Sequence, residues 1–225
     1  MASPDLLFAQ DTFLYLRWPG GVCSKDQCCF PSSWTVKDDF LVQYLATTGL
    51  PPCNNTPNFN PSQLQPILTD LNEYWPSLSC PSNSMADWEN TWNDNGICTG
   101  FSQHDYFTNA LALRTSAHLL NVLSNKGIEP SRYMSYKATE VVSAINEGLG
   151  GVQTAVLHCG SNSSSILRDL RLCADSTAST FITCSDPRPN TCSDTITLLP
   201  LASTTVEDEV DDSLEAGDII KMVVS

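Results

Sequence analysis

The sequence predicts a disulfide-stabilised globular domain that contains both helices and strands. Apolar strand-like runs lie near both ends of the chain, and apolar residues recur at helical spacing between them. The chain of 225 residues also contains 10 cysteines, an even and high number. A hydrophobic fraction of 41% provides for a sizeable core and argues against general disorder. This length suits one large domain or two small ones.

Two strands are predicted in the first 50 residues. Residues 6–18 alternate loosely between aromatic or aliphatic residues and others, and the Trp-Pro-Gly-Gly turn at residues 18–21 ends this strand. Residues 40–45 form a second, almost continuous apolar run. Residues 47–61 are rich in Pro, Asn and Thr, so we expect them to form a loop.

Helical periodicity dominates the middle of the chain. Helices are predicted over residues 61–75, 88–95, 104–126 and 137–148. The third helix has the clearest pattern and is followed by Gly127, a common C-terminal stop. The second is predicted because Trp88 and Trp92 are four positions apart and therefore share a helix face. Further strands are predicted over residues 152–157, 166–172, 179–183 and 195–199.

The end of the chain differs from the rest. We expect a single domain over residues 1–205 and an acidic tail over residues 206–225, because residues 207–212 read Glu-Asp-Glu-Val-Asp-Asp. The tail is interpreted as a solvated segment. The alternative is that residues 218–224 add an edge strand to this sheet or to the sheet of a partner.

The cysteines indicate an oxidising compartment. Ten cysteines would form five disulfides there, and zinc binding is disfavoured because Cys28 and Cys29 are adjacent and no Cys-x-x-Cys occurs. Asn54 and Asn162 lie in sequons for N-glycosylation. The N-terminus lacks the features of a signal peptide, so the chain is interpreted as a mature or trimmed protein, secreted or vacuolar through the secretory pathway.

Charge and hydropathy exclude some classes of function. The net charge is -14, from 25 acidic and 11 basic residues, which gives no support for nucleic-acid binding. No run of about 18 apolar residues occurs, so no membrane span is expected. The sequence indicates no cofactor and no metal site, and it gives no signal for oligomeric state.

One segment carries the most specific signal. Residues 88–98 resemble the second active-site box of the T2-type ribonucleases, in their plant S-like branch, which reads Trp, any, His, Glu, Trp, any, Lys, His, Gly, Thr, Cys. Both Trp, the Gly and the Cys are present. The positions that match His, Glu, Lys and His hold Asn90, Thr91, Asp94 and Asn95. The segment therefore keeps the Trp, Gly and Cys residues of the box and lacks the ionisable residues of its catalytic site.

Other segments extend this resemblance over about residues 6–200. Residues 40–47 match the first active-site box, and Gln43 stands where the family has His. Leu16 and Arg17 precede Trp18-Pro19 where the family usually carries a Gln that helps to build a base pocket. Residues 23–31, 74–82 and 103–107 also resemble family segments.

The resemblance implies a fold and a disulfide pattern. The family fold is α+β, with a central antiparallel sheet flanked by helices, and the expected structure is thus disulfide-rich and ribonuclease T2-like. The order of the cysteines in the family implies five pairs: Cys23–Cys28, Cys29–Cys80, Cys53–Cys98, Cys159–Cys192 and Cys173–Cys184.

The substitutions imply that ribonuclease chemistry is lost. Family enzymes use two His for proton transfer during attack of the ribose 2′-hydroxyl on phosphorus, which needs groups that titrate near the working pH. Asn and Gln do not titrate, and Asp94 reverses a charge where the family places a cation. His104, His118 and His158 lie away from both boxes in sequence and are interpreted as surface or structural histidines.

The altered cleft leaves several functions open. We expect no productive RNA binding and a storage or defence-type role in a plant. One alternative is a cleft that binds or transforms a small molecule, and a partner-binding module that uses the acidic tail is another. The residues expected to form such a pocket are Leu16, Gln43, Tyr44, Trp88, Glu89 and Trp92. For Trp88 and Trp92 the favoured interpretation is that they are packing residues. For Glu89 and Asp94 it is that they lie on a solvated helix face.

Overall fold

The centre of the molecule is a four-stranded antiparallel sheet. The computed structural model describes residues 11–32, 38–48, 58–160, 163–185 and 189–201. The strands lie in the order β2-β1-β5-β4, and every neighbouring pair is antiparallel. Their bounds are β1 Thr12–Arg17, β2 Leu41–Thr47, β4 Val156–Gly160 and β5 Ser163–Ala174. A small two-stranded sheet pairs β3 (Tyr136–Lys137) with β6 (Thr195–Ile196).

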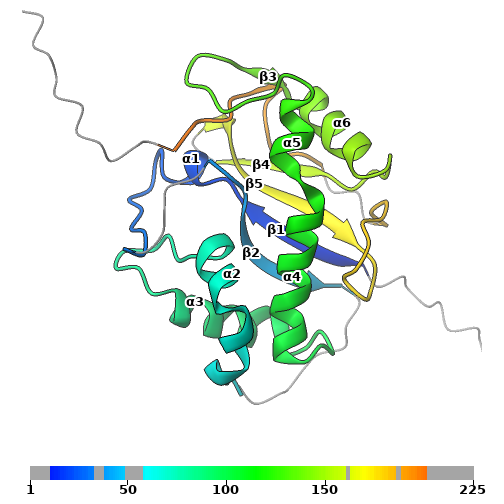
Figure 1. The fold of residues 1–225 in the computed structure, drawn as a ribbon. Coiled ribbons are helices and arrows are strands. Elements are labelled where there is room, and N and C mark those ends of the chain that lie inside the picture. Colours follow the sequence, from blue (N-terminus) through cyan, green and yellow to red (C-terminus); the bar gives the residue numbers. More distant parts are fainter. Residues whose placement is uncertain (1–10, 33–37, 49–57, 161–162, 186–188, 202–225) are drawn as a thin grey trace, which may run out of the picture.

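Helices flank this sheet, which confirms the predicted α+β class (Figure 1). Their bounds are α1 Pro19–Val22, α2 Leu68–Tyr74, α3 Ser84–Thr91, α4 Gln103–Ala117, α5 Leu119–Ser124 and α6 Ala138–Gly148. A 3-10 helix, η1 (Pro61–Ile67), leads into α2, and a π-helix, η2 (Trp92–Gly96), continues α3. Figure 1 shows α4 and α5 running across the sheet, with α2 and α3 beside the β2 edge.

Strand alternation decides which side chains of β1 enter the core. Leu14 and Leu16 are fully buried in the main hydrophobic cluster, together with Ala110 and Leu113 of α4. Tyr15 and Arg17 point to the opposite face because successive side chains of a strand alternate. The sheet therefore has one face packed on α4 and one face that carries polar groups.

Close backbone contact explains the Trp-Pro-Gly-Gly segment. A Cβ on Gly21 would lie 1.8 Å from the carbonyl oxygen of Leu167 in β5, so only glycine fits there. The Trp18 indole Nε1 donates to the carbonyl of Leu199 at 2.7 Å. The predicted turn is thus a short helix, α1, pressed against β5.

Two predicted helices differ from the structure. The predicted helix 104–126 is two helices, because His118 adopts a left-handed backbone with φ of 43° between α4 and α5. The predicted helix 61–75 begins as the 3-10 helix η1, which contains Pro66. Proline has no backbone N–H and hinders regular α-helical hydrogen bonding.

The predicted C-terminal strands are only partly confirmed. The region predicted as a strand at 166–172 lies within the longer β5, and the prediction at 152–157 is shifted to β4. The segment 179–183 is not a strand, and only Phe181 forms an isolated bridge, to Ala174. The segment 195–199 shortens to β6, followed by a bridge between Thr197 and Ile166.

Four of the five expected disulfides are present in the described residues: Cys23–Cys28, Cys29–Cys80, Cys159–Cys192 and Cys173–Cys184. For the fifth expected pair, Cys53 lies outside the described residues. The sequon residues Asn54 and Asn162 and the acidic tail 206–225 also lie outside them.

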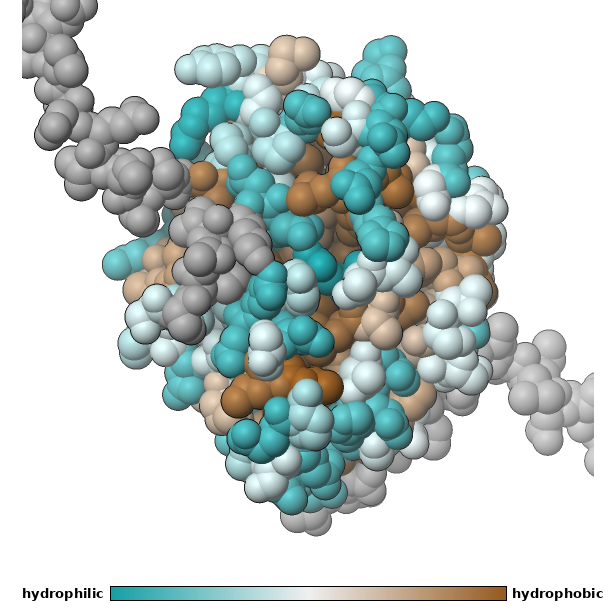
Figure 2. Space-filling model, in the orientation of Figure 1, coloured by the Kyte–Doolittle hydropathy of each residue, from teal (hydrophilic) through white to brown (hydrophobic). Residues whose placement is uncertain are grey.

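The surface over the helices is mixed in polarity. Figure 2 shows hydrophobic side chains between α2 and α4 that are separated by hydrophilic ones, so no continuous apolar band covers this face. Within the described ranges, no helix combines the length and hydropathy that crossing a bilayer requires.

Candidate functional site

A cavity of about 250 Å³ lies between β2, the loop after α2, and α3. Its polar lining consists of Arg17, Gln43, Ser79, Asp87, Asn90 and Thr91. Its apolar lining consists of Leu41, Val42, Trp75, Pro76 and Leu78. Residues from both predicted active-site boxes therefore meet in one concave site, as expected for a small-molecule pocket with a few converging polar groups.

A β-bulge presents Gln43 to this cavity. The register pairs Tyr44 with Tyr15 and Val42 with Leu16, so Gln43 has no partner residue in β1. An extra residue of this kind interrupts the ladder and redirects its side chain. Val42 and Leu45, on either side of the bulge, are buried in the core, whereas Gln43 lines the cavity.

Helix α3 presents the second box. Asn83 caps the helix by accepting a hydrogen bond from the Ala86 N–H at 3.2 Å. Asn90 and Thr91 follow about two helical turns after this cap and line the cavity. The chain then continues as η2, which carries Asp94 exposed and Asn95 half-buried, both outside the cavity lining.

The two tryptophans of the box form the core behind the cavity. Trp88 and Trp92 are 1% and 4% exposed, and both belong to the main hydrophobic cluster. The Trp88 Nε1 donates to the Trp75 carbonyl at 2.8 Å, and the Trp92 Nε1 donates to Asn58 Oδ1 at 2.9 Å. Gly96 leaves room for the Trp92 ring, since a Cβ there would lie 2.3 Å from it.

The expected pocket is therefore corrected. Of its six residues, only Gln43 lines the cavity. Leu16, Trp88 and Trp92 face the core, because strand alternation and the four-residue helical spacing turn them inward. Glu89 is exposed on α3 outside the lining. Tyr44 stacks on Tyr15 with ring centroids 4.2 Å apart instead of lining the cavity.

Sequence reasoning did not identify Asp87 and Ser79 as lining residues. Asp87 precedes Asn90 by three positions, a spacing that places two residues on one helix face, so this signal was available. Ser79 is contributed by the loop after α2 and carries no comparable pattern.

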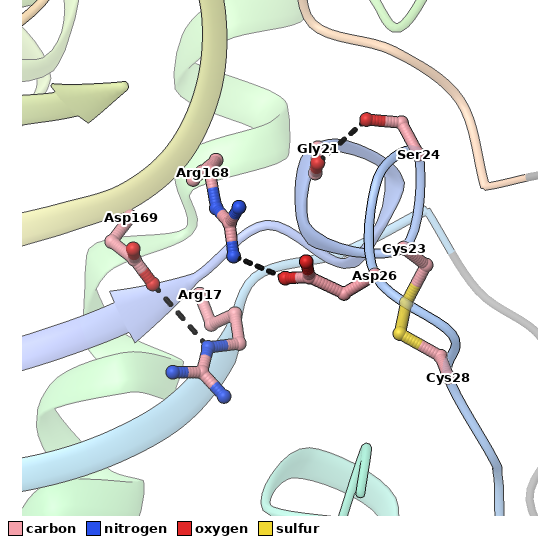
Figure 3. Close-up of polar contacts among 8 residues, drawn as sticks. All are labelled: Arg17, Gly21, Cys23, Ser24, Asp26, Cys28, Arg168 and Asp169. Carbon is pink, nitrogen blue, oxygen red and sulfur yellow. Dashed lines mark hydrogen bonds and ion pairs between the residues drawn. A yellow bond between two sulfur atoms is a disulfide. The ribbon is translucent and has the colours of Figure 1, made fainter. Parts of the chain in front are cut away.

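Arg17 of the cavity lining and Arg168 of β5 form separate ion pairs (Figure 3). The Arg17 Nε lies 3.3 Å from Asp169 Oδ1, with side chains 32% and 26% exposed. Arg168 contacts Asp26 at 2.5 Å and does not line the cavity. The two terminal nitrogens of Arg17 take no part in the contact with Asp169, which runs through Nε alone (Figure 3).

Beside Arg17, the polar face of the sheet holds a pair of tyrosines. Burial raises the pKa of the Tyr44 hydroxyl to about 12, and the adjacent Tyr15 adds to this shift through charge repulsion and a hydrogen bond. Arg17 opposes the shift, because a cation favours the tyrosinate. Tyr44 is therefore a neutral hydroxyl at ordinary pH.

None of the three histidines lines the cavity. His104 lies in the first turn of α4 with Nδ1 3.7 Å from Asp105, His118 links α4 to α5, and His158 lies in β4. Among the described residues there is also no group of three or more His, Cys, Asp or Glu side chains arranged to hold a metal ion.

The sheet, the helices around it and the position of the cavity between the two boxes define the fold class of the T2 ribonucleases. The family model described as Ribonuclease T2 family matches residues 10–184. The chain belongs to this family.

Plant proteins are among its relatives. Ribonuclease 3 of Arabidopsis thaliana is 36% identical over 189 residues, covering 79% of this chain and 85% of that protein. Intracellular ribonuclease LX of Solanum lycopersicum is 31% identical, covering 77% of each chain. A ribonuclease-like storage protein of Panax ginseng is 28% identical, covering 76% of this chain and 73% of that protein.

Solved structures show the same fold. RNase NT in complex with 5′-AMP superposes with a TM-score of 0.77 at 27% identity, covering 86% of this chain and 99% of that one. The RNase-related protein from Calystegia sepium superposes with a TM-score of 0.71 at 26% identity, covering 85% of this chain and 97% of that one.

Proposed function

We propose that this member of the T2 family does not cleave RNA and belongs to its plant S-like branch. The observation that carries the proposal is the lining of the cavity by Gln43 and Asn90, at two of the three positions that match histidines in the active-site boxes of the family. An amide neither accepts nor releases a proton near neutral pH, and each general acid or base contributes about 10²–10⁴-fold to a rate.

The surrounding residues do not replace the missing groups. Thr91 stands where the family has Glu, and its hydroxyl cannot act as a carboxylate. Asp94 is exposed on η2 and carries a negative charge where a cation would stabilise the developing charge on phosphorus. The histidines lie outside the cavity lining, so none is placed to take over proton transfer there.

We propose a storage or defence-type role for the scaffold. The similarity to the ribonuclease-like storage protein of Panax ginseng supports this role. The disulfides support it further, because each cross-link restricts the unfolded chain and typically stabilises a fold by about 2–4 kcal/mol. They also support passage through the secretory pathway to a vacuole or the cell exterior, since disulfides persist in oxidising compartments.

A second candidate function is the binding of a small molecule. The cavity favours this alternative, because it retains a concave shape and carries polar side chains together with an apolar wall. Storage as such requires no ligand, so ligand binding would add to it.

The test is cleavage of single-stranded RNA at mildly acidic pH. We expect the wild-type chain to match a buffer blank beside an active plant relative. A variant with Gln43→His, Asn90→His, Thr91→Glu, Asp94→Lys and Asn95→His should gain activity, because the frame that holds these positions is intact. Cleavage by the wild type that Gln43→Ala with Asn90→Ala abolishes would overturn the proposal. Cleavage that this double variant leaves unchanged, but that replacement of His104, His118 and His158 by Ala abolishes, would also overturn the proposal, whereas cleavage that survives both sets of substitutions would come from a contaminant.

A further inference from the structure

We infer that the cavity binds a small zwitterionic molecule, with its carboxylate on Arg17 and its amine on Asp87. This inference rests on the proposed loss of ribonuclease function and names the ligand class of the same cavity. The two residues are the charged side chains of the lining, and they carry opposite charges.

Arg17 is positioned to bind a carboxylate. Asp169 holds its Nε at 3.3 Å and so fixes the orientation of the guanidinium, while no other described residue accepts a hydrogen bond from it. In Figure 3 the dashed contact with Asp169 ends on Nε, and neither terminal nitrogen is joined to Asp169. Two parallel N–H donors on a fixed guanidinium match the two oxygens of a carboxylate.

Asp87 is positioned to bind an amine. It lies half-buried in the first turn of α3 and lines the cavity. Its carboxylate makes no ion pair or hydrogen bond with any residue in the described ranges. A partly desolvated carboxylate is stabilised by a nearby cation, and an ammonium group supplies both the charge and three donors.

The charge balance of the cavity disfavours a polyanion. Arg17 contributes one positive charge that Asp169 already shares, and Asp87 contributes one negative charge. A phosphate chain would therefore meet one shared cation and one repelling carboxylate. A ligand with one charge of each sign leaves neither group without a partner.

The other lining residues and the volume of the cavity determine the size and polarity of the ligand. Gln43, Asn90 and Thr91 offer amide and hydroxyl groups near the charged pair, whereas Leu41 and Leu78 supply part of an apolar wall. The cavity of about 250 Å³ lies below the range of roughly 300–1,000 Å³ that is usual for drug-sized ligands. An amino acid with an apolar side chain has the matching charges, size and polarity.

The experiment is calorimetric titration of the full chain at neutral pH with three probes that share a phenylethyl body. L-Phenylalanine carries both charges, 2-phenylethylamine only the amine, and 3-phenylpropanoate only the carboxylate. We expect L-phenylalanine to bind roughly ten-fold or more tightly than either single-charge probe, because each loses one charged contact.

Two variants test whether Arg17 binds the carboxylate of the ligand and Asp87 binds its amine. Arg17→Gln should reduce the affinity for L-phenylalanine to that for 2-phenylethylamine and leave the amine probe unchanged. Asp87→Asn should reduce it to the affinity for 3-phenylpropanoate and leave the carboxylate probe unchanged. Arg168→Gln and Glu89→Gln are the matched controls, because these residues lie on β5 and α3 outside the cavity lining, and they should alter none of the three affinities.

Two results would overturn the inference. The first is the absence of saturable binding of L-phenylalanine at millimolar concentration. The second is equal affinity for L-phenylalanine and 2-phenylethylamine together with no effect of Arg17→Gln. Cleavage of RNA by the wild-type chain is a separate readout that tests the proposed function, so the two failures are distinguishable.

Discussion

The two faces of the α3–η2 segment differ in burial and in hydrogen bonding. The core face carries Trp88 and Trp92, which are almost fully buried and hydrogen-bonded through their indole nitrogens. The cavity face carries Asn90 and Thr91, whose side chains make no hydrogen bond to a described residue and which stand where the family has His and Glu. Packing constrains the first face tightly, whereas we expect substitutions on the second face to have little effect on stability.

The largest effect on stability is expected from one of two substitutions on the same helix. Trp88→Ala should lower the free energy of unfolding by about 3–5 kcal/mol, because it opens a cavity and leaves the Trp75 carbonyl without its donor. Asn90→Ala, two positions later, should change it by less than about 0.5 kcal/mol. Denaturant titration measures both values. Equal effects would show that the cavity face also supports the fold.

A second comparison concerns two ion pairs outside the cavity lining, one largely buried on α4 and one more exposed on β5. Asp39 accepts hydrogen bonds from Arg114, whose side chain is 10% exposed, and from the Phe40 N–H at 2.7 Å. Asp39→Asn should cost about 1.5–3 kcal/mol of unfolding free energy, because a charged hydrogen bond in a desolvated site is lost.

The matched control for that comparison is Asp26→Asn. Asp26 pairs with Arg168 at 2.5 Å, yet its side chain is 53% exposed. Solvent screens such a pair, so the cost should be at most about 1 kcal/mol. Chemical unfolding of both variants at the same ionic strength provides the measurement. A larger loss for Asp26→Asn would show that burial does not decide how much each ion pair contributes to stability.

The sequence could predict the features that follow from family motifs. It could not predict those that depend on contacts between segments far apart in the chain. The resemblance to the two active-site boxes of the family predicted that Gln43 and Asn90 belong to one site. It could not show that Gln43 sits on a β-bulge, since a bulge exists only relative to the neighbouring strand. The break at His118 carries neither Gly nor Pro, so local propensity gave no sign of it.

The pairing of Arg17 with Asp169 was equally hidden. These residues are separated by 152 positions and meet only because β1 and β5 are adjacent in the sheet. The disulfides, in contrast, followed from the family order of cysteines. Long-range polar contacts are thus the part of the site that required the structure.

A third prediction tests how firmly α4 anchors the strand that carries Gln43. The Tyr106 hydroxyl is fully buried, donates to the Leu45 carbonyl at 2.8 Å and accepts from the Leu45 N–H at 3.1 Å. Tyr106→Phe should cost about 1–3 kcal/mol, because both backbone groups lose their partner in the core. Tyr133→Phe is the control, since Tyr133 is 94% exposed and should show no measurable change. Thermal unfolding compares the two.

The smallest expected effect lies on the polar face of the sheet and depends on pH. Burial raises the pKa of Tyr44 to about 12, whereas an unfolded tyrosine titrates near 10. As pH rises above about 10, the unfolded chain releases this proton first, so the contribution of Tyr44 to stability is complete below pH 10 and is lost towards pH 12. The Tyr44→Phe variant lacks this titration, although it keeps that of the buried Tyr106, whose pKa is raised by burial as well.

The measurement is therefore the difference in unfolding free energy between wild type and Tyr44→Phe at pH 9 and at about pH 11. We expect the advantage of the wild type to shrink at the higher pH, because Tyr106 is present in both chains and its pKa is raised mainly by burial, with Tyr44 as the smallest of the causes. A constant difference would mean that the Tyr44 ring titrates like an unfolded tyrosine. The stacked pair with Tyr15 would then be open to solvent, and the face beside Arg17 would be as unconstrained as the cavity face of α3.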